Sequence, residues 1–269
     1  MIIGTKEFKT KQHGYIMGIL NVTPDSFSDG GNYNHLDAAL FQTEKMIKEG
    51  ADIIDIGGES TRPNYTRISD EEEIERVVPV IEAVKKRFDT VISLDTYKSP
   101  VAKAGILAGA DLINDIWGLK WDGTMAKVIA ESNVAACLMH NRKKNDYTDY
   151  LADVMTDLQE TMDMARKAGI AKEKIMLDPG IGFAKDLNQN RLLMKHLSKL
   201  SEFDVPVLLG TSRKSMIGLT LDLPVDQREE GTMATTVMGY MAGCRFFRVH
   251  NVKANKRALM MTEAICNQE

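Results

Sequence analysis

Short, almost continuously apolar runs alternate with longer amphipathic stretches from one end of the chain to the other. The apolar runs predict eight buried strands: Tyr15–Leu20, Ile53–Ile56, Val91–Leu94, Leu112–Ile113, Ala135–Met139, Ile175–Leu177, Val207–Leu209 and Phe246–Val249. The amphipathic stretches predict eight helices: His35–Glu49, Asp70–Arg87, Ser99–Ala108, Thr124–Ser132, Tyr150–Ala168, Asn188–Ser201, Glu230–Ala242 and Lys253–Cys266. Strands that are apolar at nearly every position are typical of a parallel sheet that is covered on both faces.

The alternation of strands and helices indicates parallel strands joined by right-handed crossovers. Eight such units in 269 residues fit a closed (β/α)8 TIM barrel, which is the predicted fold class. An open doubly wound sheet is the alternative, although no G-x-G-x-x-G motif opens the first helix, which disfavours dinucleotide binding. No linker or change in composition marks a second domain, so we expect one domain over 1–269 with a short lead-in at 1–13.

Composition narrows the class of protein further. With 43% hydrophobic and 27% charged residues the chain can bury a full core, and its net charge of −4 disfavours a nucleic-acid binder. The three cysteines, Cys137, Cys244 and Cys266, lack the spacing of a disulfide framework or a zinc ribbon. We also find no apolar segment typical of a signal peptide and no run of about 18 apolar residues that could span a membrane. These observations predict a cytoplasmic globular enzyme with no nucleic-acid or membrane partner.

Polar residues or glycine-rich turns follow nearly every predicted strand at its C-terminal end. In chain order they are Asn21, Asp55, Asp95, Asn114–Asp115, His140–Asn141, Asp178–Gly180, Gly210–Ser215 and Arg248–Asn251. In a barrel these positions converge on the mouth that carries catalysis. A polar residue after one strand is commonly a simple loop or cap residue, but a set that follows all eight strands indicates a functional site.

Carboxylate and amide groups would lie near the centre of this mouth, on Asp55, Asp95, Asn114, Asp115 and Asp178. A buried carboxylate accepts paired N–H donors, so it can bind an edge where a ring N–H lies beside an exocyclic amine. A guanine-like fused heterocycle presents such an edge. We therefore expect a selective polar slot for a heterocycle, because a ligand that lacked one partner would leave a buried polar group unpaired.

A second group of residues at the mouth is cationic. Arg62, Arg213, Lys214, Arg248 and His250 follow the second, seventh and eighth predicted strands. Barrels often bind phosphate at the loops after strands seven and eight. Because the whole chain is slightly acidic, this local positive charge predicts an anionic substrate.

The first loop, residues 21–31, is long and polar, which predicts a mobile functional lid. Asn21 and Asp25 in this loop carry oxygen ligands suited to Mg²⁺ shared with a phosphate. Loops rich in Asn and Asp are also commonly simple turns, so this pair by itself leaves a metal site open.

Several motifs resemble those of the dihydropteroate synthase family, in order, from about residue 14 to the end of the chain. They are Asn-Val-Thr-Pro-Asp-Ser-Phe-Ser-Asp-Gly-Gly (21–31), Gly-Gly-Glu-Ser-Thr-Arg-Pro (57–63), Ser-Leu-Asp-Thr-Tyr-Lys (93–98), Asn-Asp-Ile (114–116), Asp-Pro-Gly-Ile-Gly-Phe (178–183), Ser-Arg-Lys-Ser-Met-Ile-Gly (212–218) and Arg-Val-His (248–250). The resemblance implies a (β/α)8 barrel that joins 4-aminobenzoate to 6-hydroxymethyl-7,8-dihydropterin diphosphate and releases diphosphate. It also implies Mg²⁺ as cofactor and a homodimer formed by the helices after the seventh and eighth strands.

The resemblance assigns roles to matching positions. The pterin-binding set is Asp95, Asn114, Asp178 and Lys214, with apolar packing from Ile116 and Met139. The diphosphate set is Asn21, Arg248 and His250, with Mg²⁺ near Asn21 and Asp25. The region that receives 4-aminobenzoate comprises Thr61, Arg62, Pro63, Phe183 and Ser215. Segment 141–145 and Trp117 depart from the family pattern, so no role is carried over to them.

Diphosphate departure is expected to precede amine attack, because an amine on an electron-poor aryl ring is a weak nucleophile. The expected catalytic residues are Asp95, Asp178, Lys214, Arg248 and His250. The carboxylates would stabilise a cationic pterin methylene, and the cations after the last strand would neutralise the leaving group. Two alternatives remain: a pterin-dependent methyltransferase of the same barrel family, which would not need the cationic group, and a catalytically silent pterin-binding barrel.

Overall fold

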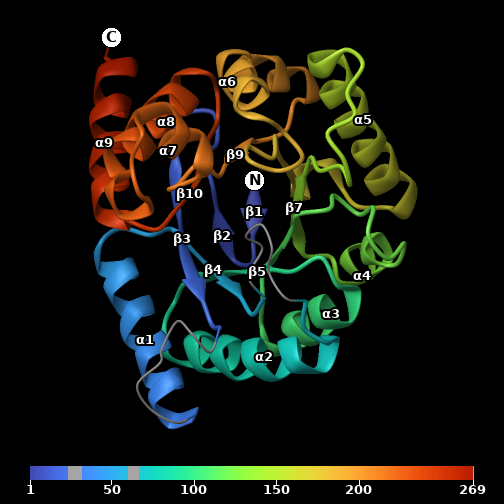
Figure 1. Cartoon of the computed structure of the whole chain (residues 1–269). Helices are drawn as coiled ribbons and strands as arrows, with labels where there is room; N and C mark the ends of the chain where they lie inside the picture. The colour runs from blue at the N-terminus through green and yellow to red at the C-terminus, as the bar shows by residue number, and fades with distance from the viewer. Residues whose placement is uncertain (24–31, 60–66, 269) are drawn as a thin grey trace.

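A ring of helices encloses a barrel of strands in the computed structural model, which describes residues 1–23, 32–59 and 67–268 (Figure 1). The barrel strands are β3 (Tyr15–Asn21), β4 (Ile53–Gly57), β5 (Val91–Asp95), β6 (Leu112–Asp115), β7 (Ala135–Met139), β8 (Ile175–Asp178), β9 (Leu208–Leu209) and β10 (Phe246–Val249). In the described ranges these eight strands pair in parallel in the order β8-β7-β6-β5-β4-β3-β10-β9. A parallel bridge between Leu177 and Val207 joins the two ends of that order. The predicted (β/α)8 barrel is confirmed, and the open sheet is wrong.

The surrounding helices are α1 (Asn32–Lys48), α2 (Asp70–Arg87), α3 (Ser99–Ala108), α4 (Met125–Ser132), α5 (Tyr150–Ala168), α6 (Leu187–Lys195), α7 (Ser215–Leu221), α8 (Glu229–Met241) and α9 (Val252–Cys266). The short helix α7 has no counterpart among the eight predicted helices. Across the described parts of the chain, none of the helices combines the length and the apolar character that crossing a membrane requires.

The predicted helix Asn188–Ser201 is wrong in its second half. Helix α6 ends early, and a 3₁₀ helix, η3 (Leu197–Phe203), follows it. Leu197, Leu200 and Phe203 are buried at a spacing of three, which matches the tighter turn of a 3₁₀ helix. Apolar residues spaced by three or four satisfy both helix types, so the sequence pattern could not separate them.

The lead-in forms an antiparallel hairpin, β1 (Ile2–Ile3) and β2 (Lys6–Glu7), at the N-terminal end of the barrel. Ile3 and Phe8 are buried against residues from the beginnings of the barrel strands. Those residues are Met17, Ile53, Val91, Leu112, Ala135, Cys137, Met176, Leu208 and Phe246. The hairpin therefore provides an apolar floor for the barrel and leaves the opposite end as its mouth.

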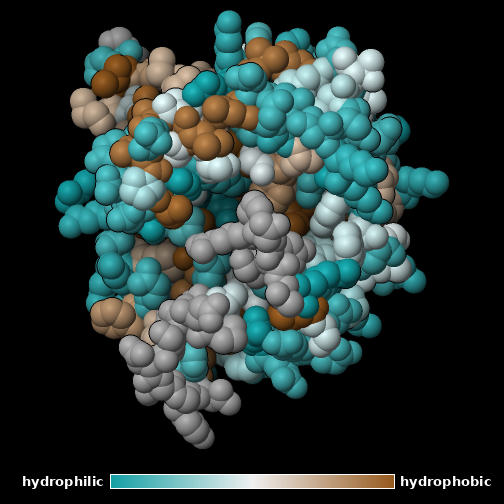
Figure 2. All heavy atoms as spheres, in the orientation of Figure 1, coloured by the Kyte–Doolittle hydropathy of each residue, from teal (hydrophilic) through white to brown (hydrophobic). Residues whose placement is uncertain are grey.

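Exposed apolar side chains gather on the outer helices near the end of the chain. Leu219, Met238, Met241 and Met260, from α7, α8 and α9, expose 67%, 51%, 71% and 59% of their surface. Figure 2 shows hydrophobic patches, in brown, over the corner where these helices lie in Figure 1. The rest of this face is mostly hydrophilic.

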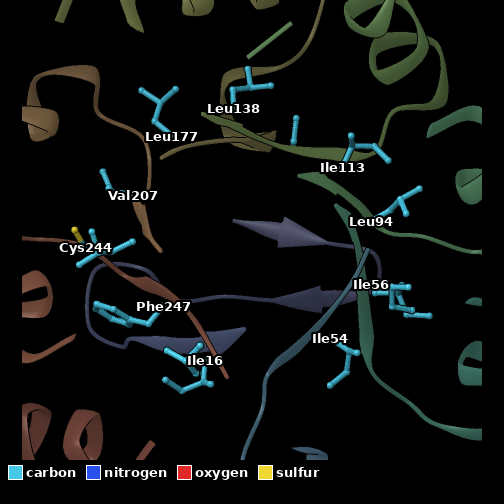
Figure 3. Packing of buried hydrophobic residues seen from close by; sticks show 14 of the residues in the cluster. Ile16, Ile54, Ile56, Leu94, Ile113, Leu138, Leu177, Val207, Cys244 and Phe247 are labelled. Atoms are coloured by element: carbon cyan, nitrogen blue, oxygen red, sulfur yellow. The ribbon is translucent and has the colours of Figure 1, made fainter. Parts of the chain in front are cut away.

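The larger apolar core lies between the barrel and its helices. Alternate strand residues, including Ile16, Ile54 and Ile113, point outward into it (Figure 3). Leu177 and Val207 extend the same layer across the strands that close the barrel. Because side chains alternate along a strand, the inward-facing positions can change from apolar to polar without disturbing this outer layer.

Candidate active site

The inward-facing positions of the strands become polar toward the mouth. Side chains two positions apart on a strand point to the same side of the sheet. Asp55 therefore points into the barrel as Ile53 of the floor does, and Asn114 points inward as Leu112 does. The inward polar set is Asp55, Ser93, Asp95, Asn114, Asp178 and Arg248. The strand register places Asp55 beside Ser93 and Asp95 beside Asn114. The alternation and the register together gather these groups in one polar layer above the apolar floor.

Arg248 lies between two carboxylates of that layer. Its Nε donates to Asp55 Oδ2 at 2.6 Å, and its Nη2 donates to Asp95 Oδ2 at 2.6 Å. Ser93 donates from Oγ to Asp55 Oδ1 at 2.5 Å. Asp95 Oδ1 is buried and has no hydrogen-bond partner among the described residues. A buried acceptor of this kind costs free energy until a ligand supplies a donor.

The charges of these groups are set by burial and by one another. Burial raises the pKa of the Asp95 carboxyl to about 7, although the guanidinium of Arg248 opposes the shift. Burial disfavours the charge on Arg248, but the carboxylates of Asp55 and Asp95 outweigh it and raise the pKa of the guanidinium. Arg248 therefore stays charged, whereas Asp95 can change its charge near neutral pH.

Asp178 and Lys214 approach each other across the same mouth. Lys214 Nζ donates to the carbonyl oxygen of Ile181 at 2.5 Å and lies 4.7 Å from the centroid of the Phe183 ring. A Cβ at Gly210 would lie 3.6 Å from Asp178 Oδ2 and 3.7 Å from Lys214 Nζ, so the glycine leaves room between both groups. Burial raises the pKa of Asp178 and lowers the pKa of Lys214 to about 8, and each group opposes the shift of the other.

His250 takes its orientation from Ser212. The Oγ of Ser212 lies 2.9 Å from His250 Nδ1 and accepts the backbone N–H of His250 at 3.1 Å. Arg213 has a different partner, because its Nε lies 3.8 Å from Glu229 Oε2 of α8. Of the predicted cations after β9, Lys214 therefore faces the polar layer, while Arg213 pairs with an outer helix.

A small apolar wall borders the polar layer. Its buried members are Tyr97, Ile116 and Met139, and Trp117, Trp121 and Phe183 pack against them. The structure thus brings together Ile116, Met139 and Phe183, which the sequence motifs placed in one site. Trp117, a departure from the family pattern, belongs to the same wall.

Three further predicted site residues lie in the described ranges, at the ends of strands or at the start of a helix. Asn21 ends β3 beside Gly57 of β4, and Ser215 is the exposed first residue of α7. Asn114 Nδ2 lies 3.4 Å from Asp55 Oδ2. Four predicted residues lie outside the described ranges: Asp25, Thr61, Arg62 and Pro63.

Asp115 does not belong to the polar slot, so its expected place there is wrong. It accepts backbone N–H groups from Trp117 at 2.8 Å and from Leu119 at 2.7 Å. Strand alternation points it away from its neighbour Asn114, and burial raises its pKa to about 7. Asp115 stabilises the turn after β6 rather than the mouth.

A buried charged cluster beside the mouth was not predicted. Lys98 Nζ lies 2.8 Å from Glu59 Oε2 and 2.8 Å from Glu73 Oε2. The OH of Tyr97 donates to Glu59 Oε1 at 2.6 Å, and the backbone N–H of Ile68 donates to Glu59 Oε2 at 3.0 Å. Glu59 therefore joins the end of the β4 segment to the residues before α2. No spacing rule finds this cluster, because its members come from separate elements.

The chain resembles known proteins over almost its whole length. Residues 17–250 match the family described as pterin binding enzyme. A dihydropteroate synthase of Clostridium beijerinckii is 56% identical over 266 residues, which cover 98% of this chain and 99% of the relative. The structure of a Clostridium difficile dihydropteroate synthase in the presence of pteroic acid matches with a TM-score of 0.95 and 46% identity, covering 97% and 100% of the two chains. A Xanthomonas albilineans dihydropteroate synthase with 4-aminobenzoic acid matches with a TM-score of 0.91 and 40% identity, covering 96% and 94%.

The chain belongs to the family of pterin binding enzymes, whose barrel and polar mouth it shares. Within that family it belongs to the dihydropteroate synthases, transferases of folate biosynthesis, as the motifs implied. The alternatives of a pterin-dependent methyltransferase and of a silent pterin-binding barrel are therefore not retained.

Proposed function

We propose that the mouth of the barrel joins 4-aminobenzoate to 6-hydroxymethyl-7,8-dihydropterin diphosphate, with the pterin ring in a slot formed by Asp95, Asn114, Asp178 and Lys214. The observation that carries this proposal is the buried Asp95 Oδ1, for which the described residues supply no donor. The pteridine ring presents N–H groups that can satisfy buried carboxylates, while Lys214 offers a donor to ring acceptors. Ile116 and Met139 would pack against the flat ring.

The diphosphate is proposed to bind beside the slot, at Arg248, His250 and Asn21. The two carboxylates engage Nε and Nη2 of Arg248, which leaves Nη1 for an anion at the mouth. Ser212 holds the imidazole of His250 at the same end of the barrel. Charge-assisted hydrogen bonds from these groups would stabilise the departing diphosphate more strongly than the bound substrate, which lowers the barrier.

Mg²⁺ is the proposed cofactor, with oxygen ligands from Asn21 and Asp25. Asn21 is the last residue of β3, and by strand alternation it faces the same way as Met17, the register partner of Arg248. Its amide oxygen suits a hard cation that is shared with phosphate. When bound, Mg²⁺ would supply positive charge against the diphosphate oxygens.

Departure of diphosphate leaves positive charge on the exocyclic methylene of the pterin. Asp95 and Asp178 would stabilise this charge at short range, where burial makes a carboxylate more effective than water. The amine of 4-aminobenzoate then attacks the methylene carbon, and the new secondary ammonium releases its proton to water. The aminobenzoate region is proposed to comprise Thr61, Arg62, Pro63, Phe183 and Ser215. No nucleophilic side chain takes part in this sequence of steps.

Diphosphate release tests the proposed reaction directly. Release should be fast with both substrates together and slow with the pterin diphosphate alone, because the amine traps the cation. No release should occur with 4-aminobenzoate alone. Release that is independent of 4-aminobenzoate would indicate a hydrolase and would contradict the proposal.

We further propose that the chain acts as a single domain, in the cytoplasm, and as a homodimer. The exposed apolar residues of α7 and α8, among them Leu219 and Met241, favour an interface at that corner (Figure 2). The buried free thiols of Cys137 and Cys244 are compatible with a reducing compartment. Sedimentation of the wild-type chain and of Met241→Glu would test the dimer, because a buried charge at its interface should shift the equilibrium to monomer.

A further inference from the structure

Lys185, in the loop between β8 and α6, has three acceptors for its amino group, two in the same loop and one after β7. Its Nζ donates to the carbonyl oxygens of Gly180 at 2.9 Å and of Phe183 at 3.0 Å. The third contact is Nδ1 of His140, at 2.8 Å, just after β7. Burial lowers the pKa of Lys185 to about 7, and Asp178 opposes the shift. In its ammonium form the side chain carries three N–H donors, and each of them then has an acceptor.

The imidazole of His140 is held from its other side as well. Its Nε2 lies 3.0 Å from Asp157 Oδ2 of α5, and Arg142 donates to the same oxygen at 2.6 Å. Burial lowers the pKa of His140 to about 4, so the ring is neutral at pH 7 and carries one hydrogen. Because the Asp157 carboxylate only accepts, the hydrogen belongs on Nε2, and Nδ1 accepts from Lys185.

The segment that Lys185 contacts is strained. Gly180, Gly182 and Ala184 have φ values of +71°, +86° and +46°, in the left-handed region. That conformation is unfavourable for an alanine and persists only where surrounding contacts hold it. The N–H of Phe183 donates to the Gly180 carbonyl at 3.1 Å, which closes the turn that Lys185 bonds at both ends.

This turn positions groups of the mouth. The N–H of Gly180 donates to Asp178 Oδ1 at 2.7 Å, which leaves Oδ2 of that carboxylate toward Lys214. Lys214 in turn donates to the carbonyl of Ile181 and lies over the ring of Phe183. A change in the turn therefore moves a carboxylate, an ammonium and an aromatic ring together.

We propose that Lys185 is a positioning residue for the pterin slot. Its bonds to Gly180, Phe183 and His140 hold the 180–183 turn, and the turn in its place orients Asp178 and Lys214. The inference rests on the proposed function, because it takes Asp178 and Lys214 to bind the ring. Lys185 does not touch the substrate and acts only through its neighbours.

The first test is Lys185→Met, which keeps the length of the side chain and removes its donors. The KM for the pterin diphosphate and the Kd for the unphosphorylated hydroxymethyl pterin should both rise by about tenfold or more, since small displacements of site groups have effects of this size. Lys172→Met is the matched control, because Lys172 is half exposed and its ion pair within the described ranges is with Asp204, at 3.0 Å. That control should leave both constants unchanged. A purely structural role would lower the melting temperature of Lys185→Met without raising either constant.

Two substitutions of His140 separate its two hydrogen bonds. His140→Asn keeps an acceptor near the Nδ1 position for Lys185, whereas His140→Gln keeps a donor near the Nε2 position for Asp157. His140→Asn should bind the pterin within about threefold of wild type. His140→Gln should bind it more weakly than His140→Asn but lose less than Lys185→Met, because Gly180 and Phe183 still accept from Lys185. The double variant Lys185→Met/His140→Gln should lose no more than Lys185→Met alone. If Lys185→Met fails to fold, His140→Asn and His140→Gln still decide the question, because equal pterin binding in these two variants would contradict the role of the Lys185–His140 bond.

Pterin binding within twofold of wild type in Lys185→Met would overturn the role of Lys185. Asp178→Asn, measured beside it, distinguishes the two levels of the argument. Loss of binding in Asp178→Asn alone would remove only the positioning role of Lys185. Unchanged binding in both variants would also remove Asp178 from the slot, and the proposed site would be wrong.

Discussion

Arg248 Nη2 donates to Asp95 Oδ2 at 2.6 Å, although 153 residues separate the two in the chain. The bond joins the last barrel strand to the third strand of the barrel and fixes the guanidinium beside the mouth. It also occupies one oxygen of Asp95 and leaves the other buried without a donor among the described residues. The same contact thus orients a cation for the proposed diphosphate and an acceptor for the proposed ring.

Asp178→Asn should abolish most of the activity. Gly180 donates to Oδ1 of Asp178, so an asparagine would keep its oxygen there and turn its amide N–H₂ toward the donors of the ring. We expect kcat/KM to fall by an amount that corresponds to a loss of at least about 3 kcal/mol of transition-state stabilisation. A loss of this size is typical when two buried hydrogen-bond donors face each other near a charged group. Asp163→Asn, on the exposed surface of α5, is the control. Activity within about twofold of wild type would remove Asp178 from the site.

His250→Ala should discriminate between two ligands. It should weaken binding of the pterin diphosphate and leave the unphosphorylated hydroxymethyl pterin almost unchanged, because the second ligand has no diphosphate to lose. Asn114→Ala should weaken both ligands by similar factors. Calorimetry of both ligands against both variants measures these ratios. Equal losses for the two ligands in His250→Ala would show that His250 does not contact the diphosphate.

The activity should fall at alkaline pH through Lys214. Burial lowers the pKa of Lys214 to about 8, so the ammonium is charged below that pH and neutral above it. Because kcat/KM reports groups of the free enzyme, its profile for the pterin diphosphate should decline as pH rises through about 8. That decline should be absent from the residual activity of Lys214→Met and present in Lys185→Met. A decline that survives unchanged in Lys214→Met would assign it to another group.

Phe8→Ala should destabilise the barrel from its floor. Phe8 is 3% exposed and packs among the first residues of the strands, so its removal leaves a cavity that the barrel cannot fill. We expect the free energy of unfolding to fall by about 3 to 5 kcal/mol, with KM unchanged in the folded enzyme. Ile2→Ala, at a position that is 61% exposed, is the control and should stay within about 0.5 kcal/mol. Equal stability of the two variants would mean that the lead-in does not seal the barrel.

The sequence alone determined the repeating architecture. Strands buried on both faces must be apolar at nearly every position, so β4 and β5 are visible as runs such as Ile53–Ile56 and Val91–Leu94. It also indicated most candidate site residues, because polar residues at the C-terminal end of an apolar run lie toward the mouth of a barrel, where their side chains point inward or into a turn. Asp178 ends β8 and Arg248 lies in the last part of β10, so each is local to its own strand.

Contacts between distant segments were decided only by the tertiary structure. The apolar residues of Asn188–Ser201 fit an α-helix and a 3₁₀ helix alike, and packing against the barrel selected the second after α6. Strand alternation turned Asp115 away from Asn114, although the two are neighbours in the chain. The bonds of Lys185 to His140 and to the strained turn have no sequence pattern, because they join the ends of two strands through side chains. Local periodicity reports which face of an element is buried, whereas hydrogen-bond partners depend on which elements the closed barrel places side by side.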